Sequence, residues 1–394
     1  MRIGLISSGT PTDRIPPIYG GGIQKYLWSL ASALIILGHE VHIFASQQPQ
    51  QLKEELLEGI HVHRIARTLK TKSLATFLFG AKTVFRLLQI QKATGPFQII
   101  HAQSRVSGLI VRLFFRKTPF IFTAHNWDVA LTRPNEIISR LPHTALTLIE
   151  KAVLSYSDAI ISLTPFFQKV LTTRYKLPGT KIQVIPNMVR ISQQTDRHYT
   201  QSPVMTKLLA KPFLLFVGRL EKEKGVDFLL EFAKQKSSQG NPQKLIIIGT
   251  GSQKNTLRMM TTELGLQNSV HILGTVHEDH LNALISSASA LILPSDFEIM
   301  PTVILEAWTA KCPVLVHTYR GVQALIRDRE TGLLFQTKNP VQLSHLVEEL
   351  LTNEDLRHKI VQNSLTRVKT VYAASIVGRQ IISLYFSVLK GCPP

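Results

Sequence analysis

The sequence predicts an α/β protein with two domains, each built on a doubly wound parallel sheet. The first observation is length, because 394 residues exceed what one ordinary hydrophobic core supports. The second is that short β-branched runs alternate with longer amphipathic stretches in both halves, which is typical of parallel βα units. The third is a composition of 44% hydrophobic and 18% charged residues, which is ordinary for a globular protein.

Short apolar runs in each half predict the strands. In the first half they cover residues 2–6, 41–44, 60–64, 99–102, 120–123, 159–163 and 182–185. In the second half they cover residues 213–217, 244–248, 270–273, 290–293 and 314–317. Each set is expected to form its own sheet, and two such sheets facing one another would place a ligand cleft between the domains.

Changes in composition suggest where the domains begin and end. We expect an N-terminal domain over residues 1–190 and a C-terminal domain over residues 212–371. Residues 191–211 are polar and lack periodicity, so they are expected to form the linker. Residues 372–394 are expected to hold a C-terminal helix, because residues 372–389 are apolar and periodic.

The formal charge of +19 is concentrated in the first half. Residues 59–127 contain no Asp or Glu but eleven Lys and Arg. Such a region attracts polyanions, either lipid headgroups or nucleic acid. Nucleic acid is not expected, because few aromatic residues are arranged for base stacking. Residues 73–91 carry apolar side chains at helical spacing with basic residues around them, which fits either a membrane-surface helix or a helix packed on the sheet.

The cysteine content and the hydropathy of the chain indicate the cellular compartment in which the protein is expected. The two cysteines, Cys312 and Cys392, imply no disulfide framework and favour a reducing compartment. The apolar run at the N-terminus is short for a signal peptide, and no stretch is long enough to span a membrane. We therefore expect a cytoplasmic protein that can associate with the inner face of a membrane.

Two glutamates eight positions apart, Glu298 and Glu306, form the most informative motif. Glu298 follows an apolar strand-like run, and Glu306 lies inside the helix that Pro301 is expected to open. The first free amides of that helix, from Thr302 and Val303, favour an anion such as a phosphate. Carboxylates on both sides of an anion site suit a nucleotide sugar, which has hydroxyls at both ends and phosphates between them.

A charged run follows the first strand of the second half. It reads Gly218-Arg219-Leu220-Glu221-Lys222-Glu223-Lys224-Gly225 and precedes a helical pattern. Arg219 and Lys224 lie where two cations can converge on a diphosphate through charge-assisted hydrogen bonds. A solvated turn in which Glu221 and Glu223 pair with the lysines is the alternative.

Glycine-rich turns occur between a strand and a helix in both halves. Gly20, Gly21 and Gly22 precede a helical pattern, and glycines there let the backbone approach a phosphate. Gly249 and Gly251 occupy a similar turn, which is structural in many sheets of this kind. Turns of this type in both halves fit one ligand that spans the cleft.

Two histidines follow predicted strands in the first half. His125 follows the run 120–123, at the carboxyl end of that strand, and His101 has a similar placement with a weaker case. A satisfied histidine at a strand end is the alternative for both. No metal site is expected, because Asp296 and Glu298 have a metal-ligand spacing without supporting ligands.

Taken in order, these residues resemble the retaining nucleotide-sugar glycosyltransferases of the group 4 type. The matching motifs span nearly the whole chain and include Gly20-Gly21-Gly22, Gly38-His39-Glu40, Thr123-Ala124-His125, the run from Gly218 to Gly225, the Glu298 and Glu306 pair, and Thr331-Gly332-Leu333-Leu334. The resemblance implies the GT-B fold, in which two Rossmann-like domains face each other across a cleft. It also implies that the last helix crosses back to the N-terminal domain, which binds the acceptor.

The resemblance assigns roles to individual residues. It makes His125, Glu298, Arg219 and Lys224 catalytic: the two cations bind the donor diphosphate, Glu298 lies by the donor sugar, and His125 lies near the anomeric centre. Glu306 binds the ribose hydroxyls. The donor-binding residues are then Gly21, Gly22, Gly218, Arg219, Lys224, Gly249, Gly251, Glu298, Ile299, Met300, Pro301, Thr302, Val303 and Glu306.

The expected function is transfer of a sugar from a nucleotide diphosphate sugar, with retention and without a metal cofactor, to a glycan or lipid-linked acceptor. Two departures from the family pattern keep other functions open. Ile299 stands where a glycine is usual, and Ala324 where a glutamate is usual. A catalytically weak nucleotide- or carbohydrate-binding scaffold would explain both changes, and a polyanion-binding protein would explain the charge.

Overall fold

The structure is a computed structural model, and it describes residues 1–10, 13–18, 21–66, 72–125, 140–191, 203–336 and 339–391. Gly20, Cys392 and most of the expected linker therefore lie outside the described residues. The side chains of Lys72 and Ser73 are outside them as well.

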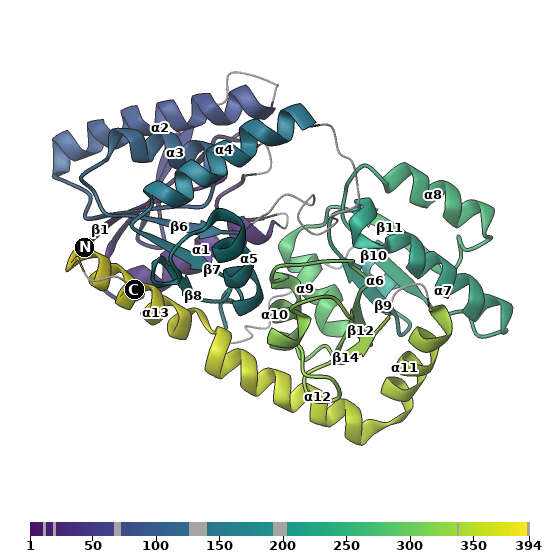
Figure 1. The fold of residues 1–394 in the computed structure, drawn as a ribbon. Helices are drawn as coiled ribbons and strands as arrows, with labels where there is room; N and C mark the ends of the chain where they lie inside the picture. Colours follow the sequence, from purple (N-terminus) through teal and green to yellow (C-terminus); the bar gives the residue numbers. More distant parts are fainter. Residues whose placement is uncertain are drawn as a thin grey trace. The chain divides into compact units, whose positions relative to one another are not determined.

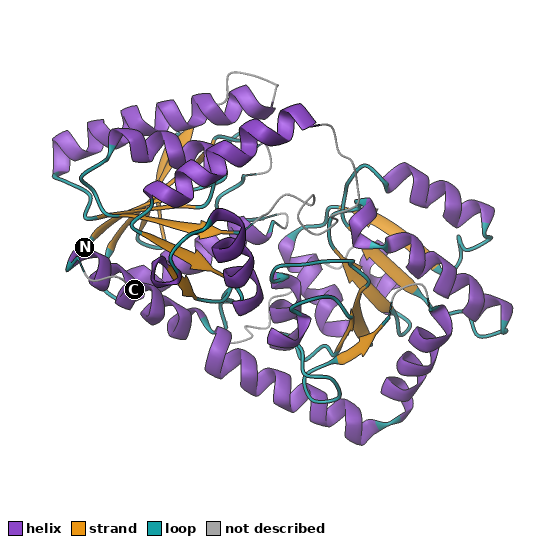
Figure 2. Ribbon diagram, in the orientation of Figure 1, coloured by secondary structure: helices purple, strands orange, loops and turns teal. Residues whose placement is uncertain are grey.

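The chain divides into two compact units. Unit 1 consists of Met1–Met188 together with Ala374–Pro394, and unit 2 consists of Val189–Ala373. The chain thus passes from unit 1 to unit 2 after Met188 and returns after Ala373. In each unit the strands lie at the centre and the helices lie outside them (Figure 2).

Unit 1 is built on a sheet with the strand order β3-β4-β2-β1-β5-β6-β7-β8. All neighbouring strands are parallel except β3, which is antiparallel to β4. The strands are β1 (Arg2–Ile6), β2 (Glu40–Ser46), β3 (Glu54–Leu57), β4 (Ile60–Ile65), β5 (Ile99–Ala102), β6 (Phe120–Ala124), β7 (Ala159–Ser162) and β8 (Ile182–Val184).

Two layers of helices cover the sheet of unit 1. Helix α3 contacts both α2 and α4, and Figure 1 shows these three helices on one side of the sheet. Helix α1 contacts the last helix, α13, in the other layer. The helices of this unit are α1 (Gly22–Ile36), α2 (Lys72–Thr94), α3 (Arg105–Phe114), α4 (Arg140–Tyr156), α5 (Pro165–Tyr175) and α13 (Ala374–Leu389).

Unit 2 is built on a parallel sheet with the strand order β11-β10-β9-β12-β13-β14. Its strands are β9 (Leu214–Val217), β10 (Leu245–Ile248), β11 (Val270–Gly274), β12 (Ala290–Leu293), β13 (Val314–His317) and β14 (Leu333–Phe335). The central strands are buried along nearly their whole length, as expected for a parallel sheet covered on both faces.

Helices flank the sheet of unit 2 as well. Helix α7 contacts α8 and α11, whereas α10 contacts α9 and α12. The helices are α6 (Pro203–Leu209), α7 (Val226–Ser238), α8 (Lys254–Glu263), α9 (Glu278–Ser287), α10 (Thr302–Thr309), α11 (Pro340–Thr352) and α12 (Glu354–Arg367). A short π-helix, η5 (Val368–Tyr372), continues α12 to the end of the unit.

The two parallel-sheet, Rossmann-like domains confirm the predicted fold class. Every predicted strand is present, with ends that differ by at most two residues. The structure adds two strands that the sequence pattern does not predict, β3 and β14. The range 191–211, expected to be a linker, contains helix α6, whose Met205 and Leu208 side chains are buried.

Candidate functional site

In unit 2, the loops at one point of the sheet edge carry the predicted donor residues. The strand order reverses between β9 and β12, since β10 and β11 lie beyond β9 and β13 and β14 lie beyond β12. In open α/β sheets, ligands bind beyond the carboxyl ends of the strands at such a switch point. Residues 218–225 follow β9 and residues 294–301 follow β12, so the two runs meet there.

An ion pair joins these two runs. The ammonium of Lys224 contacts the carboxylate of Glu298, and these residues are 74 positions apart in the sequence. The side chains are 12% and 18% exposed. Ser295 Oγ donates a second hydrogen bond to Glu298 Oε1 at 3.0 Å. Burial, and after it the charge of Glu298, raises the pKa of the Tyr319 hydroxyl above its ordinary value.

Arg219 lies in the same turn and is far more exposed. Its Nη2 atom is 3.2 Å from Glu223 Oε1, and 67% of its side chain is exposed. Glu221 accepts hydrogen bonds from the backbone and hydroxyl of Ser252, at 3.2 and 2.6 Å. The two glutamates of the charged turn thus bond to Arg219 and Ser252, whereas the alternative interpretation expects them to pair with the lysines, and Lys224 pairs with Glu298.

The start of α10 lies beside this pair. The helix begins at Thr302, with Pro301 as its N-cap residue, so it begins one residue later than expected. As the first two helical residues, Thr302 and Val303 have N–H groups without partners inside the helix. Glu306 lies one turn further on and is half-buried, as is Ile299. Met300, on the same loop as Ile299, is buried.

The glycines of unit 2 allow two loops to pack closely. A Cβ atom on Gly249 would overlap the carbonyl oxygen of Gly218, and one on Gly251 would overlap that of Leu220. The loops are also joined by the backbone, because Leu220 N donates to Thr250 O at 2.9 Å. Contact between the loops after β9 and β10 therefore explains Gly249 and Gly251 without a ligand, and their donor-binding role stays a prediction.

In unit 1, a buried carboxylate joins the loop after β1 to the first turn of α1. Gly21 adopts a φ of 98°, and a Cβ atom on it would overlap the side chain of Gln24. Gln24 Nε2 donates to Asp13 Oδ1 at 3.2 Å, and Gly9 N donates to Asp13 Oδ2 at 2.9 Å. Asp13 is fully buried, and burial raises its pKa. Gly22 is exposed and begins α1.

His125 is oriented by Gln103. His125 Nε2 lies 2.6 Å from Gln103 Oε1, and the ring of Tyr26 packs edge-on against the imidazole with centroids 4.5 Å apart. Because an amide oxygen only accepts, Nε2 carries the proton and Nδ1 is an acceptor. Burial lowers the pKa of His125 to about 3, so the ring is neutral near neutral pH. Strands β5 and β6 are parallel neighbours, which brings Gln103 and His125 to the same edge of the sheet.

His101 is a structural residue. It is fully buried, and both of its ring nitrogens are engaged inside unit 1. Nδ1 lies 2.7 Å from the hydroxyl of Tyr385 in α13, and Nε2 lies 2.6 Å from Thr123 Oγ1. The weaker of the two histidine candidates is therefore a satisfied core residue.

The comparisons with known proteins match both units. Residues 20–193 match the model of Glycosyltransferase Family 4, and residues 201–367 match the model of Glycosyl transferases group 1. The chain belongs to the GT4-type glycosyltransferases of the GT-B fold. Its activity is accordingly that of a glycosyltransferase.

Individual proteins similar to this GT4-type transferase cover nearly its full length. An uncharacterized glycosyltransferase of Methanocaldococcus jannaschii is 24% identical over 98% of both chains. The structure of sucrose-phosphate synthase from Thermosynechococcus elongatus matches with a TM-score of 0.81 at 20% identity, covering 99% of this chain and 100% of the other. The structure of Anabaena HepE in complex with UDP-glucose matches with a TM-score of 0.72 at 19% identity, covering 98% and 100%.

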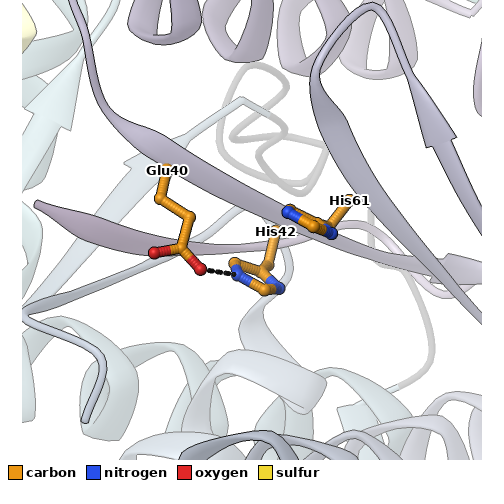
Figure 3. Close-up of side chains that lie close together, drawn as sticks. All are labelled: Glu40, His42 and His61. Carbon is orange, nitrogen blue, oxygen red and sulfur yellow. Dashed lines mark hydrogen bonds and ion pairs between the residues drawn. The ribbon is translucent and has the colours of Figure 1, made fainter. Parts of the chain in front are cut away.

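A second polar cluster of the transferase lies where β2 and β4 begin, at the opposite end of these strands from the glycine loop. Glu40, His42 and His61 each place one possible metal-ligand atom within 4.8 Å of the others (Figure 3). The rings of His42 and His61 are stacked, with planes only 12° apart, so their in-plane lone pairs do not converge on one ion. Arg2 Nε already donates to Glu40 Oε1 at 2.8 Å. The cluster is therefore a hydrogen-bonded part of the sheet.

Sequence reasoning missed two residues that support the predicted sites. Gln103 and Asp13 belong to no motif, yet Gln103 bonds to His125, and Asp13 joins Gly9 to Gln24 of α1. Gln103 could have been found from its place directly after a predicted strand, like His125.

Among the described residues of the transferase, no helix is long and apolar enough to cross a membrane.

Proposed function

We propose that this chain transfers a sugar from a nucleoside diphosphate sugar to an acceptor hydroxyl, with retention of configuration at the anomeric carbon. The observation that carries the proposal is the ion pair of Lys224 and Glu298 at the switch point of unit 2. A sheet of this kind binds ligands at that point. A partly buried cation there is suited to an anionic ligand.

One of the two cations, Arg219, is available to a diphosphate at low cost. Arg219 is mostly exposed, and an exposed ion pair such as that with Glu223 contributes about 0–1 kcal/mol. A diphosphate offers both cations charge-assisted hydrogen bonds, which are about twice as strong as neutral ones. The amides at the start of α10, which have no partner inside the helix, add a third group that favours phosphate.

The remaining donor contacts follow from the same arrangement. We assign the ribose hydroxyls to Glu306 and the sugar to Glu298, which lies on the loop before α10. The structure of Anabaena HepE contains UDP-glucose. Uridine diphosphate and its sugars are therefore the first donors to test.

The proposed transfer accounts for the bond formed, the bond broken and the proton without the use of a metal ion. The acceptor oxygen forms a bond to the anomeric carbon while the bond from that carbon to the diphosphate oxygen breaks on the same face. The acceptor proton passes to the departing diphosphate oxygen. Arg219, Lys224 and the amides of Thr302 and Val303 stabilise the charge that develops on the diphosphate. Neutral His125, oriented by Gln103, is assigned to the anomeric centre as a hydrogen-bonding group.

For the acceptor, we propose a glycan or a lipid-linked sugar at the cytoplasmic face of a membrane. The support is the absence of Asp and Glu from residues 59–127, with eleven Lys and Arg in the same range. A basic surface of this kind is attracted to anionic lipid. Binding of nucleotide without turnover would instead favour the scaffold function, for which Ile299 is the supporting observation.

The decisive experiment compares two lysines of one turn. Lys224→Ala is expected to weaken binding of uridine diphosphate by about 1.5–3 kcal/mol and to abolish transfer, because it removes a charge-assisted contact. Lys222→Ala removes the same charge two positions away, at an exposed side chain, and is the matched control. Calorimetry and a transfer assay, both with a chelator present, measure the two effects. Equal behaviour of the two variants would refute the assignment.

A further inference from the structure

Helix α2 is apolar on two opposite faces. Its inner face is buried and includes Phe79, Leu87 and Ile90. At Gly80 the helix approaches α3 so closely that a Cβ atom would lie 2.9 Å from Ile110 Cδ1. A helix that is packed on one side and lies at the surface is expected to carry polar residues on its outer side. The outer side of α2 departs from that expectation.

The outer face of α2 carries a row of large apolar side chains. Leu74, Phe77, Phe85 and Leu88 are 52%, 52%, 64% and 48% exposed. Their spacing of three, eight and three residues places them on one side of the helix, with exposed Ala81 between them. We call these four residues the α2 stripe. At a rise of 1.5 Å per residue the stripe is about 21 Å long.

A neighbouring helix carries further exposed apolar side chains. Helix α3 contacts α2 and ends with Leu113 and Phe114, which are 43% and 69% exposed. Of the four exposed phenylalanines among the described residues, three lie on α2 and α3. Figure 1 shows both helices in the same outer layer of unit 1.

This layer is also basic. Helices α2 and α3 contain no Asp or Glu. The single acid of α4, Glu150, is 3% exposed and pairs with Arg105. One cation of α2, Arg86, pairs with Glu54 of the neighbouring strand β3. Exposed lysines remain on each of the three helices or directly after it, namely Lys92, Lys117 and Lys151.

We propose that the α2 stripe inserts into the surface of an anionic phospholipid bilayer, with the surrounding lysines at the headgroups. An exposed apolar row on a helix whose charged residues are all cations is the pattern of helices that lie in the plane of a membrane surface. A second copy of the chain fits less well, because a two-fold interface would set the same cations opposite each other. The charge also separates this surface from an ordinary protein interface, whose core is depleted of lysine.

Membrane insertion of the α2 stripe would also place a lipid-linked acceptor, and this part of the inference rests on the proposed function. Helix α2 follows β4 and therefore begins at the edge of the sheet where the parallel strands end. His125 lies after β6 at that same edge. Leu74 and Phe77, in the first turns of α2, thus bring lipid to the edge of unit 1 that carries His125. An acceptor sugar attached to a lipid would then be presented at this edge.

The test measures sedimentation of the full chain with two kinds of vesicle, phosphatidylcholine alone and phosphatidylcholine mixed with phosphatidylglycerol. Wild type is expected to sediment with the mixed vesicles only. The double variant Phe77→Ser with Phe85→Ser should lose about tenfold or more in vesicle affinity, because two apolar side chains no longer enter the lipid. Ile36→Ser is the matched control, since Ile36 is 83% exposed but lies on α1.

A tryptophan on the α2 stripe tests contact with lipid by fluorescence and does not remove an apolar side chain. Phe85→Trp should give fluorescence that shifts to shorter wavelength on the anionic vesicles, whereas Ile36→Trp should not. Unchanged sedimentation of the serine double variant, or equal loss in Ile36→Ser, would overturn the proposal. A lower mass of the double variant than of wild type in light scattering would assign the stripe to self-association and overturn it as well.

Uridine diphosphate binding by the same variants separates this inference from the proposed function. The α2 stripe contains none of the expected donor-binding residues, which are Gly21 and Gly22 in unit 1 and the remainder in unit 2, so the double variant should bind the nucleotide like wild type. If wild type binds vesicles but no nucleotide, the proposed function fails while the membrane surface stands. If it binds nucleotide but no vesicles, only the membrane surface fails.

Discussion

Glu298 and Glu306 are eight residues apart, yet their surroundings differ. Glu298 lies on a loop, where it accepts from Ser295 and pairs with Lys224. Glu306 lies on α10, one turn from the helix start. In the proposed function, the loop carboxylate exchanges its partner when a diphosphate takes Lys224, and it is then free to bind a sugar hydroxyl.

This difference predicts separate effects on free nucleotide and on sugar donors. Glu306→Gln should weaken binding of uridine diphosphate and of its sugars about equally, because a ribose contact is common to both. Glu298→Gln should weaken the sugar donors more, by about 1–3 kcal/mol relative to the free diphosphate, because a charged hydrogen bond to the sugar is lost. Competition titrations with both ligand types measure the difference. The division of roles is wrong if the two variants show the same ratio of affinities.

At the scale of elements, the site depends on close packing of the turns after β9 and β10. The run after β9 donates and accepts backbone hydrogen bonds with the turn after β10. Glycine at position 251 permits this contact, because a side chain would collide with the backbone of Leu220. The glycine turn after β10 thus packs against the turn that carries Arg219 and Lys224 and supports it.

Gly251→Ala is expected to lower the melting temperature and to weaken nucleotide binding together. The added methyl group would overlap the backbone of Leu220, so the turn must shift, at a cost of about 1–3 kcal/mol. Gly179→Ala is the control, since a Cβ atom there meets nothing within 4 Å. Thermal unfolding and calorimetry measure both effects. A stable Gly251→Ala variant with normal binding would contradict this account of the turn.

The pattern of elements could be predicted from the sequence because a buried parallel strand is a run of apolar residues. Of the two strands that the pattern misses, β3 lacks that signal, whereas β14 is a very short apolar run, Leu333–Phe335. Strand β3 contains two glutamates and lies at the sheet edge with an alternating exposed pattern, and β14 has only three residues. The place of Gln103 after a predicted strand could be read from the sequence, but its role could not, because that role depends on the neighbouring strand that carries His125.

Strand β5 and helix α13 meet at a buried histidine, which predicts a pH dependence of stability. Burial lowers the pKa of His101 to about 3, so below the ordinary pKa of about 6.5 the unfolded chain binds a proton that the folded chain does not. The contribution of His101 is fully present above that pH and is lost as pH falls towards 3. This group alone should reduce the free energy of unfolding by about 1.4 kcal/mol per pH unit.

Chemical denaturation at neutral and mildly acidic pH measures this slope. His101→Gln should flatten it, because the titrating group is gone, although the variant is less stable at neutral pH through loss of contacts to Tyr385 and Thr123. His345→Gln, which removes an exposed histidine, is the control. An unchanged slope in His101→Gln would show that other groups govern the acid sensitivity.

At the scale of the whole molecule, the two units differ in the number of chain segments that form them. Unit 2 is one continuous segment, Val189–Ala373, whereas unit 1 needs both Met1–Met188 and the C-terminal segment. Helix α13 completes the core of unit 1, because Val377, Ile381 and Tyr385 are buried in one cluster with α1. Removing that helix would expose this cluster and leave His101 without one of its partners.

Unit 2 is therefore expected to fold alone and to retain most of the expected donor site. A protein of residues 189–373 should unfold cooperatively, because it has its own buried sheet and its own helices on both faces. It should bind uridine diphosphate, because Arg219, Lys224, Glu298 and Glu306 all belong to it, although it lacks Gly21 and Gly22 of the expected donor site, and it should transfer no sugar. Residues 1–188 alone should fold poorly, since they lack α13. Circular dichroism and calorimetry on the two fragments test this asymmetry, and a folded unit 2 that binds no nucleotide would show that the donor site needs residues of unit 1.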